Sequence, residues 1–407
     1  MLSSTAADDG APGPPRPFRL DVPQGDLDDL HARLDRTRWP DQPAGAGWGY
    51  GVEREYLREL VRYWRHDYDW RAAEAELNAW PQFTTTIDGA NVHFAHVRSA
   101  EPAATPLLIT HGWPGSIAEF LDVAGPLTDP VAHGGDPSDA FHLVLPSVPG
   151  FGLSGPAPDT GWEAGRIADA WAELMRRVGY HRYGLQGGDW GAAISRELGR
   201  VHPERVLGVH LNLLPGAQQA TEPTAAELAG LGAAERERTL RSWRRWDAWT
   251  RESTGYAVQQ STRPQTLAYA LNDSPVGQLA WIVEKFAEWT DSRQLPEEAV
   301  DRDRLLTNVM LYWVTGTAGS SARVYYERAH ATGRAAAPGE PSTAPTAVAS
   351  FAADPQLPLR HRARRTENLV RWTEFDRGGH FAALEQPELL VGDVRAFFRQ
   401  LRAERAG

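Results

Sequence analysis

The sequence predicts an α/β fold in which a mostly parallel, eight-stranded sheet carries a helical lid insert and an N-terminal helical extension. Three observations support this prediction. Short apolar runs typical of strands alternate with amphipathic stretches typical of helices within residues 106–215. No strand pattern occurs between residues 227 and 330, and the pattern returns at residue 346. A strand turns sharply into a helix at LQGGDWGAAI, residues 185–194.

Composition is ordinary for a globular protein and excludes several function classes. The 407 residues carry a net charge of −11, which argues against nucleic acid as a partner because phosphate binding needs a basic face. No run approaches the ~18 apolar residues that span a bilayer. Residues 1–17 lack the apolar core of a signal peptide, so we expect a disordered N-terminus, no membrane anchor and a cytoplasmic protein. Zero cysteines exclude disulfides and sulfur-ligated zinc.

Residues 18–105 are expected to form an N-terminal segment that wraps a larger core. Apolar residues recur at helical spacing in three of its stretches, residues 25–36, 53–66 and 70–80. Farther along, two runs with a period of two flank Asp88 and Gly89, which predicts a β-hairpin. His93 and His96 lie in the second run. Because residues three apart on a strand face opposite sides, we do not expect them to bind a metal together.

Residues 106–215 are expected to form the first part of the core. Its predicted strands are residues 107–110, 141–145, 180–186 and 206–213. The first strand is followed by HGWPGS, residues 111–116. A loop at the carboxyl end of a parallel strand is where open α/β sheets place ligands. The glycine-rich backbone of this loop can therefore offer free N–H groups to a ligand.

Residues 216–343 are expected to form the helical lid, and residues 344–407 the second part of the core. The lid is rich in tryptophan and tyrosine at helical spacing. The second part of the core has two predicted strands and a closing helix, residues 346–351, 369–375 and 387–401. A basic run, residues 360–365, is interpreted as a solvated loop between the two strands.

Asp189 is the candidate nucleophile. Gly187 and Gly191 lie two positions on either side of it, where a sharp strand-to-helix turn leaves room only for small residues. This spacing is the nucleophile elbow of the α/β-hydrolases, with Asp where the better-known version has Ser. A carboxylate there can attack carbon directly and form an ester. A glycine-rich turn with a solvated Asp is the alternative, and the partners of Asp189 decide between them.

An Asp nucleophile needs a base that delivers water to its ester, and the base needs an orienting acid. In the α/β-hydrolases these groups follow the order nucleophile, acid, histidine. Asp189, Asp354 and His380 satisfy that order, each just past a predicted strand. Glu374 and Asp376 are the rivals for the acid. Both lie on the strand that delivers His380, from which reaching back to its ring is awkward.

Five stretches resemble microsomal-type epoxide hydrolases, namely HGWPGS, GGDWG, LNDSPVG (271–277), LTNVMLYW (306–313) and GGHFAALEQPELL (378–390). Residues 18–80 resemble the N-terminal domain of that family, and the resemblance extends from Pro17 to the end. It implies a bacterial-type α/β-hydrolase, without a membrane anchor, that converts an epoxide and water into a vicinal diol. Microsomal relatives can use Glu as the acid, whereas this chain has Asp354.

The resemblance also assigns roles in the lid and at the loops. Tyr256 and Tyr325 match the lid tyrosines that hold the epoxide oxygen, and Tyr326 is the fallback if the alignment slips by one. The backbone N–H groups of Trp113 and Trp190 match the oxyanion hole. The mechanism implied by the resemblance uses no metal and no organic cofactor.

The expected substrate is a bulky aromatic or apolar epoxide, either a xenobiotic or an intermediate of natural-product biosynthesis. A haloalkane dehalogenase-like hydrolase also uses an Asp elbow, and a non-catalytic binding protein on the same fold is the third alternative. A dehalogenase needs halide-binding indole N–H groups in place of lid tyrosines, and a binding protein predicts a broken triad. A homodimer is compatible with the sequence, which does not fix an oligomeric state.

Overall fold

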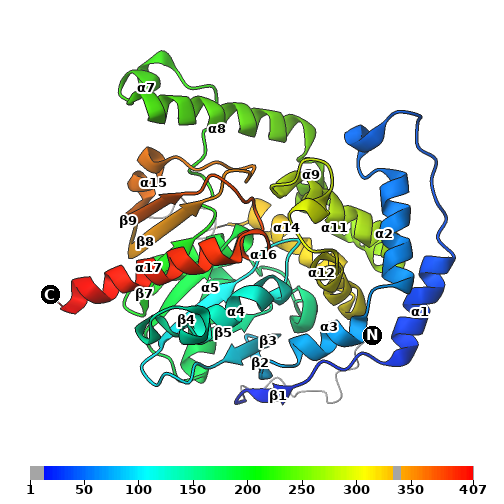
Figure 1. Ribbon diagram of the computed structural model, residues 1–407, viewed down its shortest axis with the longest axis horizontal. Helices are drawn as coiled ribbons and strands as arrows, with labels where there is room; N and C mark the ends of the chain where they lie inside the picture. Colours follow the sequence, from blue (N-terminus) through cyan, green and yellow to red (C-terminus); the bar gives the residue numbers. More distant parts are fainter. Residues whose placement is uncertain (1–12, 333–340, 407) are drawn as a thin grey trace.

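A computed structural model describes residues 13–332 and 341–406 (Figure 1), so the disorder expected of residues 1–12 lies outside the described residues. One nine-stranded sheet has the order β1-β2-β3-β5-β4-β6-β7-β8-β9. The strands are β1 (Arg16–Phe18), β2 (Gln82–Ile87), β3 (Ala90–Val97), β4 (Thr105–Thr110), β5 (Phe141–Pro146), β6 (Tyr183–Gly187), β7 (Val206–Leu211), β8 (Ser342–Ser350) and β9 (Glu367–Glu374). The strands from β5 to β9 in this order are parallel, and β3, β2 and β1 continue the sheet in antiparallel fashion.

The sheet has nine strands where the sequence predicts eight, because a short edge strand was not expected. Strand β1 places Pro17 opposite Phe83 of β2, so the expectation of disorder up to residue 17 is wrong for its last residues. Three residues are too few to show a period of two. Proline also argues against a strand, except at the edge of a sheet, which is where β1 lies.

Helices cover both faces of the sheet. On β4, Leu107 and Ile109 join the apolar cluster formed with α4 (Leu121–Thr128) and α17 (Pro387–Ala406), whereas Leu108 joins the cluster on the opposite face with α5 (Ala164–Arg177) and α6 (Asp189–Val201). Successive side chains of a strand alternate between its faces. A strand covered on both faces therefore reads as the continuous apolar run that the sequence shows.

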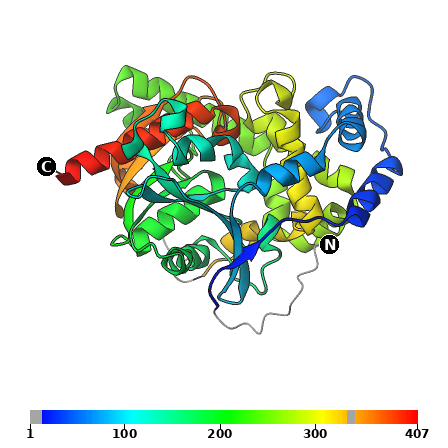
Figure 2. The same ribbon diagram turned by 60° about the horizontal axis from the view of Figure 1, so that its bottom comes forward.

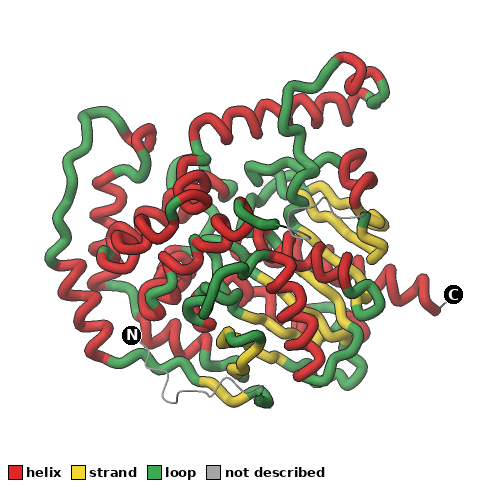
Figure 3. The backbone as a smooth tube through the Cα atoms, turned by 180° about the vertical axis from the view of Figure 1, so that it is seen from behind, coloured by secondary structure: helices red, strands yellow, loops and turns green. Residues whose placement is uncertain are grey.

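The lid lies between β7 and β8, and its described residues from 227 to 330 contain no strand, as predicted. Figure 3 shows from behind that most of its helices gather at one side of the strands, whereas one long helix extends above the strands. They are α7 (Ala225–Ala229), α8 (Ala233–Glu252), α9 (Gly255–Thr262), α10 (Pro264–Asp273), α11 (Pro275–Trp289), α12 (Arg302–Thr315), α13 (Ala318–Ser321) and α14 (Arg323–Ala329). Helix α12 holds the HGWPGS loop, because Asn308 donates to the carbonyl of Pro114 at 2.7 Å and Tyr312 to that of Gly115 at 2.6 Å.

The N-terminal helices α1 (Gln24–Asp35), α2 (Arg54–His66) and α3 (Trp70–Leu77) begin and end within three residues of their predicted positions. Figure 2 shows α1 and α2 beside the lid helices. Arg304 of α12 pairs with Glu76 of α3 and with Asp122 of α4, and Arg33 of α1 pairs with Asp273 of the lid. The N-terminal segment thus ties the lid to the core.

The predicted hairpin forms between β2 and β3, with Asp88 and Gly89 at φ values of 48° and 78° in its turn. His93 contacts Ser147 and Gln82, whereas His96 contacts the hydroxyl of Tyr180. Burial lowers the pKa of His93 to about 3 and that of His96 to about 4. The two imidazoles are therefore neutral and have separate partners.

The basic run at 360–365 forms a helix, α15 (Arg360–Thr366), so its interpretation as a loop is wrong. The helix is anchored where Leu359 donates its N–H to the carbonyl of Ala217 and where Ala363 is fully buried. Arginine favours helices, and one buried alanine fixes the face. Among the described residues, no helix is both long and apolar enough to cross a membrane.

Candidate active site

The turn between β6 and α6 places Asp189 at the carboxyl end of the sheet in a strained conformation. Asp189 has a φ of 49°, in the left-handed region that non-glycine residues rarely adopt. A Cβ on Gly187 would lie 2.3 Å from the carbonyl oxygen of Gly191, and one on Gly191 would lie 1.9 Å from that of Thr110. Both flanking glycines are therefore required sterically, as the sequence predicts for an elbow.

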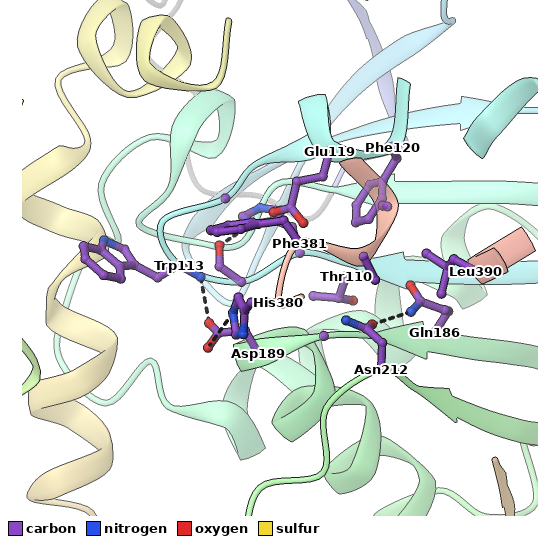
Figure 4. A pocket seen from close by; sticks show the side chains of 16 residues that line it. Thr110, Trp113, Glu119, Phe120, Gln186, Asp189, Asn212, His380, Phe381 and Leu390 are labelled. Carbon is purple, nitrogen blue, oxygen red and sulfur yellow. Dashed lines mark hydrogen bonds and ion pairs between the residues drawn. The ribbon is translucent and has the colours of Figure 1, made fainter. Parts of the chain in front are cut away.

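Two backbone N–H groups bind the Asp189 carboxylate. The N–H of Trp113, in the loop after β4, donates to Oδ1 at 2.8 Å (Figure 4), and the N–H of Trp190 donates to the same carboxylate. A Cβ on Gly112 would lie 2.3 Å from Oδ1, so only glycine at this position lets the loop approach the Asp189 carboxylate so closely. The two donors converge where an oxyanion derived from the Asp189 carboxyl group would form.

His380 lies between two carboxylates. Its Nε2 is 3.6 Å from Oδ2 of Asp189, and its Nδ1 is 3.1 Å from Oδ2 of Asp354. Asp354 is buried and its Oδ1 also accepts from the N–H of Gln356 at 2.7 Å. The rivals face elsewhere, since Glu374 pairs with Arg238 and Asp376 is largely exposed.

The loop that carries His380 is held by Glu385, which the sequence analysis did not single out. Its carboxylate accepts from the N–H groups of Gly379 at 2.8 Å and Phe381 at 3.0 Å, on both sides of His380. The N–H of His380 itself donates to the carbonyl of Trp289 at 2.8 Å. Burial raises the pKa of Glu385 to about 7, although the hydrogen bonds from Gly379 and Phe381 lower it. The position of Glu385 within GGHFAALEQPELL was the only available signal.

The charges at the site are strongly coupled. Burial opposes the imidazolium form of His380, but Asp354, Asp189 and Glu119 outweigh it and raise the pKa of His380 to about 9. Burial raises the pKa of Asp189, while His380 and the N–H groups of Trp113 and Trp190 counteract that rise. The charge of Asp189 and that of His380 therefore each shift the pKa of the other group.

Aromatic side chains from the lid close over Asp189. Tyr256 of α9 stacks on Trp113 with a centroid distance of 5.1 Å and an angle of 7°. Tyr325 of α14 packs edge-on against Trp190 at 4.9 Å and against Tyr256 at 5.8 Å. Trp289 of α11 contacts both Tyr256 and the His380 ring. Asp189 thus faces an enclosure of apolar rings that carries two phenol groups.

Both lid tyrosines interact electrostatically with Asp189. Burial raises the pKa of Tyr256, and the Asp189 carboxylate raises it further. Burial also raises the pKa of Tyr325, with further contributions from Tyr256 and Asp189. Tyr326 is less buried and stacks on His330 at 3.9 Å. The structure therefore brings Tyr325, and not its neighbour Tyr326, to the nucleophile.

Glu119 is a second buried carboxyl group close to Asp189 and His380. Burial raises its pKa to about 8, with His380 opposing the rise and Asp189 adding to it. Its Oε1 has no hydrogen-bond partner and lies where a Cβ on Gly115 would be. Glu119, Asp189 and His380 line a cavity of about 20 Å³ (Figure 4), the space of about one water molecule. Within the described part of the chain, no group of three or more His, Asp or Glu residues could hold a metal ion.

Two family models match the sequence. The model described as epoxide hydrolase N terminus matches residues 15–120, and that described as alpha/beta hydrolase fold matches residues 105–387. The chain is 46% identical over 392 residues to the Stigmatella aurantiaca protein named "Putative epoxide hydrolase", over 95% of this chain and 86% of that protein. It is 37% identical over 406 residues to Epoxide hydrolase 1 of Oryctolagus cuniculus, over 94% and 88% of the two chains.

Solved structures agree with these matches. The juvenile hormone epoxide hydrolase of the silkworm Bombyx mori superposes with a TM-score of 0.86 at 29% identity, over 97% of this chain and 96% of that chain. The Aspergillus niger epoxide hydrolase superposes with a TM-score of 0.81 at 33% identity, over 96% and 98% of the two chains.

Proposed function

Because the chain belongs to the epoxide hydrolase family of the α/β-hydrolases and is an epoxide hydrolase, we propose that it acts through a covalent ester on Asp189. One arrangement carries the proposal. Trp113 donates to one carboxylate oxygen of Asp189, and His380, backed by Asp354, lies 3.6 Å from the other. His380 has no serine hydroxyl to deprotonate, so it is placed to activate water instead.

In the first step, an oxygen of Asp189 attacks one carbon of the epoxide, and the bond from that carbon to the ring oxygen breaks. Tyr256 and Tyr325 hold this oxygen, and one phenol gives it a proton. The attacking carboxylate needs no prior deprotonation. Raised pKa values keep both phenols protonated before the reaction, as hydrogen-bond donors must be.

In the second step, His380 takes a proton from water, and the resulting hydroxide attacks the carboxyl carbon of Asp189. The N–H groups of Trp113 and Trp190 stabilise the oxyanion, and a donor of this kind typically contributes ~3 kcal/mol. The diol leaves with the proton carried by His380. The cavity of about 20 Å³ beside Asp189, His380 and Glu119 is where we place the attacking water.

Ester formation also prepares His380 to act as a base. The Asp189 carboxylate contributes to the raised pKa of His380. An ester carries no charge, so this contribution disappears once Asp189 is alkylated, and the pKa of His380 falls. The protonated ring then gives its proton to solvent more readily, and the neutral imidazole can accept one from water.

We propose a bulky apolar or aromatic epoxide as the substrate. Trp113, Trp190, Trp289 and the two lid tyrosines surround Asp189 with ring carbon, which favours apolar groups. The silkworm relative is named for juvenile hormone.

The His380→Gln variant tests the proposal. Without its base, the enzyme should still form the ester but hydrolyse it very slowly, so one substrate mass should accumulate on the peptide that contains Asp189. The measurement is intact and peptide mass spectrometry after mixing with a reactive aryl epoxide, with Asp189→Ala as the control that cannot react. A parallel assay of halide release from a haloalkane distinguishes a dehalogenase. An unmodified Asp189 peptide in a variant that binds the epoxide would exclude the ester.

A further inference from the structure

Lys285 is the only lysine among the 42 lysine and arginine residues of the chain. It lies on α11, and its side chain is only 1% exposed. Burying an ammonium is costly unless it is paired. Two neighbouring carboxylates pair with its Nζ, Glu284 at 2.6 Å and Glu288 at 2.8 Å. Lys285 is therefore a buried cation that two carboxylates of its own helix hold in place.

The Lys285 ammonium lies against a lid tyrosine. Its Nζ is 4.6 Å from the ring centroid of Tyr256 and 5.8 Å from that of Trp289. Trp113 stacks on the same tyrosine ring with a centroid distance of 5.1 Å. Tyr256 is thus held between the loop that supplies an oxyanion donor and the lid helix that supplies a cation. Among the described residues, no cation has a comparable ring contact with Tyr325.

The other charges near Tyr256 make it a weaker acid. Burial raises the pKa of its phenol, and the carboxylates of Asp189 and Glu288 raise it further, whereas the contact with the Tyr325 hydroxyl lowers it. Proton donation leaves a phenolate on the donor. A cation held at the ring stabilises that phenolate. Alkylation at the same moment removes the negative charge of Asp189, which disfavours a phenolate on Tyr256.

Given the covalent mechanism proposed above, we propose that Lys285 is a positioning residue that makes Tyr256 the proton donor of ring opening. The ester bond to Asp189 forms, the carbon–oxygen bond of the epoxide breaks, and the Tyr256 proton moves to the freed oxygen. The Lys285 ammonium lies over the ring of the phenolate left behind. Tyr325 donates a hydrogen bond but keeps its proton. When hydrolysis returns Asp189 to a carboxylate, the proton released restores Tyr256.

Ester formation should slow by about 10-fold to 10²-fold in Lys285→Met, which keeps most of the unbranched side chain and removes its charge. Lys285→Arg keeps a cation and should recover most of the rate. The rate of ester hydrolysis should not change. Rapid-quench mass spectrometry on full-length enzyme mixed with an aryl epoxide measures both steps.

Two backgrounds separate an effect through Tyr256 from a loss of packing. In Tyr256→Phe, which keeps the ring but has no proton to give, Lys285→Met should cause no further loss. In Tyr325→Phe, its full effect should remain. If Lys285→Met slows ester formation only when the Tyr256 hydroxyl is present, Lys285 acts through Tyr256 and not through packing. An equal loss in both backgrounds, or an unchanged rate in Lys285→Met, would overturn it.

Lys285→Met leaves Glu284 and Glu288 without their partner, which can prevent folding. The triple variant Glu284→Gln, Lys285→Met, Glu288→Gln removes the three charges together and leaves none buried and unpaired. It should fold and form the ester more slowly than Glu288→Gln, which keeps the Lys285–Glu284 pair and likewise lacks the Glu288 charge that raises the pKa of Tyr256. Equal rates in these two variants contradict the role of Lys285 but leave the covalent mechanism intact. Absence of any ester in His380→Gln removes the covalent mechanism itself, so the two failures are distinguishable.

Discussion

Asp189, Asp354 and His380 lie just past the carboxyl ends of β6, β8 and β9, on the loop side of the site, whereas Tyr256, Tyr325 and Lys285 lie on helices of the lid. The loops fix their groups with backbone, through glycines that tolerate no Cβ and N–H groups that bind a carboxylate. The lid fixes its groups through ring contacts and one buried cation. The loop side thus carries the groups proposed for both chemical steps, and the lid side only those proposed for the first.

Asp189→Ala should abolish both steps, because nothing else at the elbow can form the ester. We expect kcat to fall by at least about 10⁴-fold and no adduct to appear on the protein. Steady-state diol formation and mass spectrometry measure these outcomes. Substantial residual turnover would show that water attacks the epoxide directly. The assignment of both steps to the loop side and of the first step to the lid would then be wrong.

Asp354→Asn should slow only the second step. His380 would lose the partner that fixes its tautomer and stabilises its cation, so ester hydrolysis should slow by about 10³-fold while ester formation stays largely intact. Pre-steady-state kinetics should therefore show accumulated ester. Asp376→Asn is the matched control and should behave like the unmodified enzyme. The reverse pattern would reassign the acid.

Tyr256→Phe and Tyr325→Phe should slow only the first step. Each loss should be on the order of 10²-fold or less because the partner phenol remains, and the double variant should be nearly inactive. Tyr326→Phe serves as the control on the neighbouring residue. Rapid-quench measurement of ester formation decides the matter. A slowed second step in either variant would show that lid groups act in both steps, contrary to the assignment of the lid to the first step alone.

Glu119→Gln should change how the stability of the folded protein depends on pH. The pKa of Glu119 is about 8 in the folded protein against an ordinary value of 4.5, so between these pH values the folded protein holds a proton that the unfolded chain has lost. Stability then falls as pH rises through this window, by about 1 kcal/mol per pH unit. The glutamine variant should lack this component, and urea unfolding at several pH values measures it. Parallel pH curves would exclude a protonated Glu119.

The loop side could be predicted from the sequence, and most of the lid side could not. Gly187, Asp189 and Gly191 lie within five consecutive residues, and the steric requirement for glycine on both sides of Asp189 can be predicted from that spacing alone. Tyr256 and Tyr325 became candidates only through the resemblance to a family, because a tyrosine on a helix is more often part of the core.

Glu119 and Lys285 depend on contacts between distant parts of the chain. Nothing in the sequence around Glu119 indicates that its carboxyl group shares a cavity with His380. That Lys285 is the only lysine is visible in the composition, but its contact with Tyr256 arises only when α9 packs beside α11. Strand β1 was missed because pairing with β2, rather than its own pattern, makes it a strand.

The ester on Asp189 is tested most directly by a single turnover of the unmodified enzyme, in excess over the epoxide, in oxygen-18 water. The label should enter the Asp189 carboxylate, because water attacks its carboxyl carbon, and the first-turnover diol should take its new oxygen from the enzyme. Peptide and product mass spectrometry locate the label. Label found in the first-turnover diol and absent from Asp189 would show that water attacks the epoxide directly and that no ester forms.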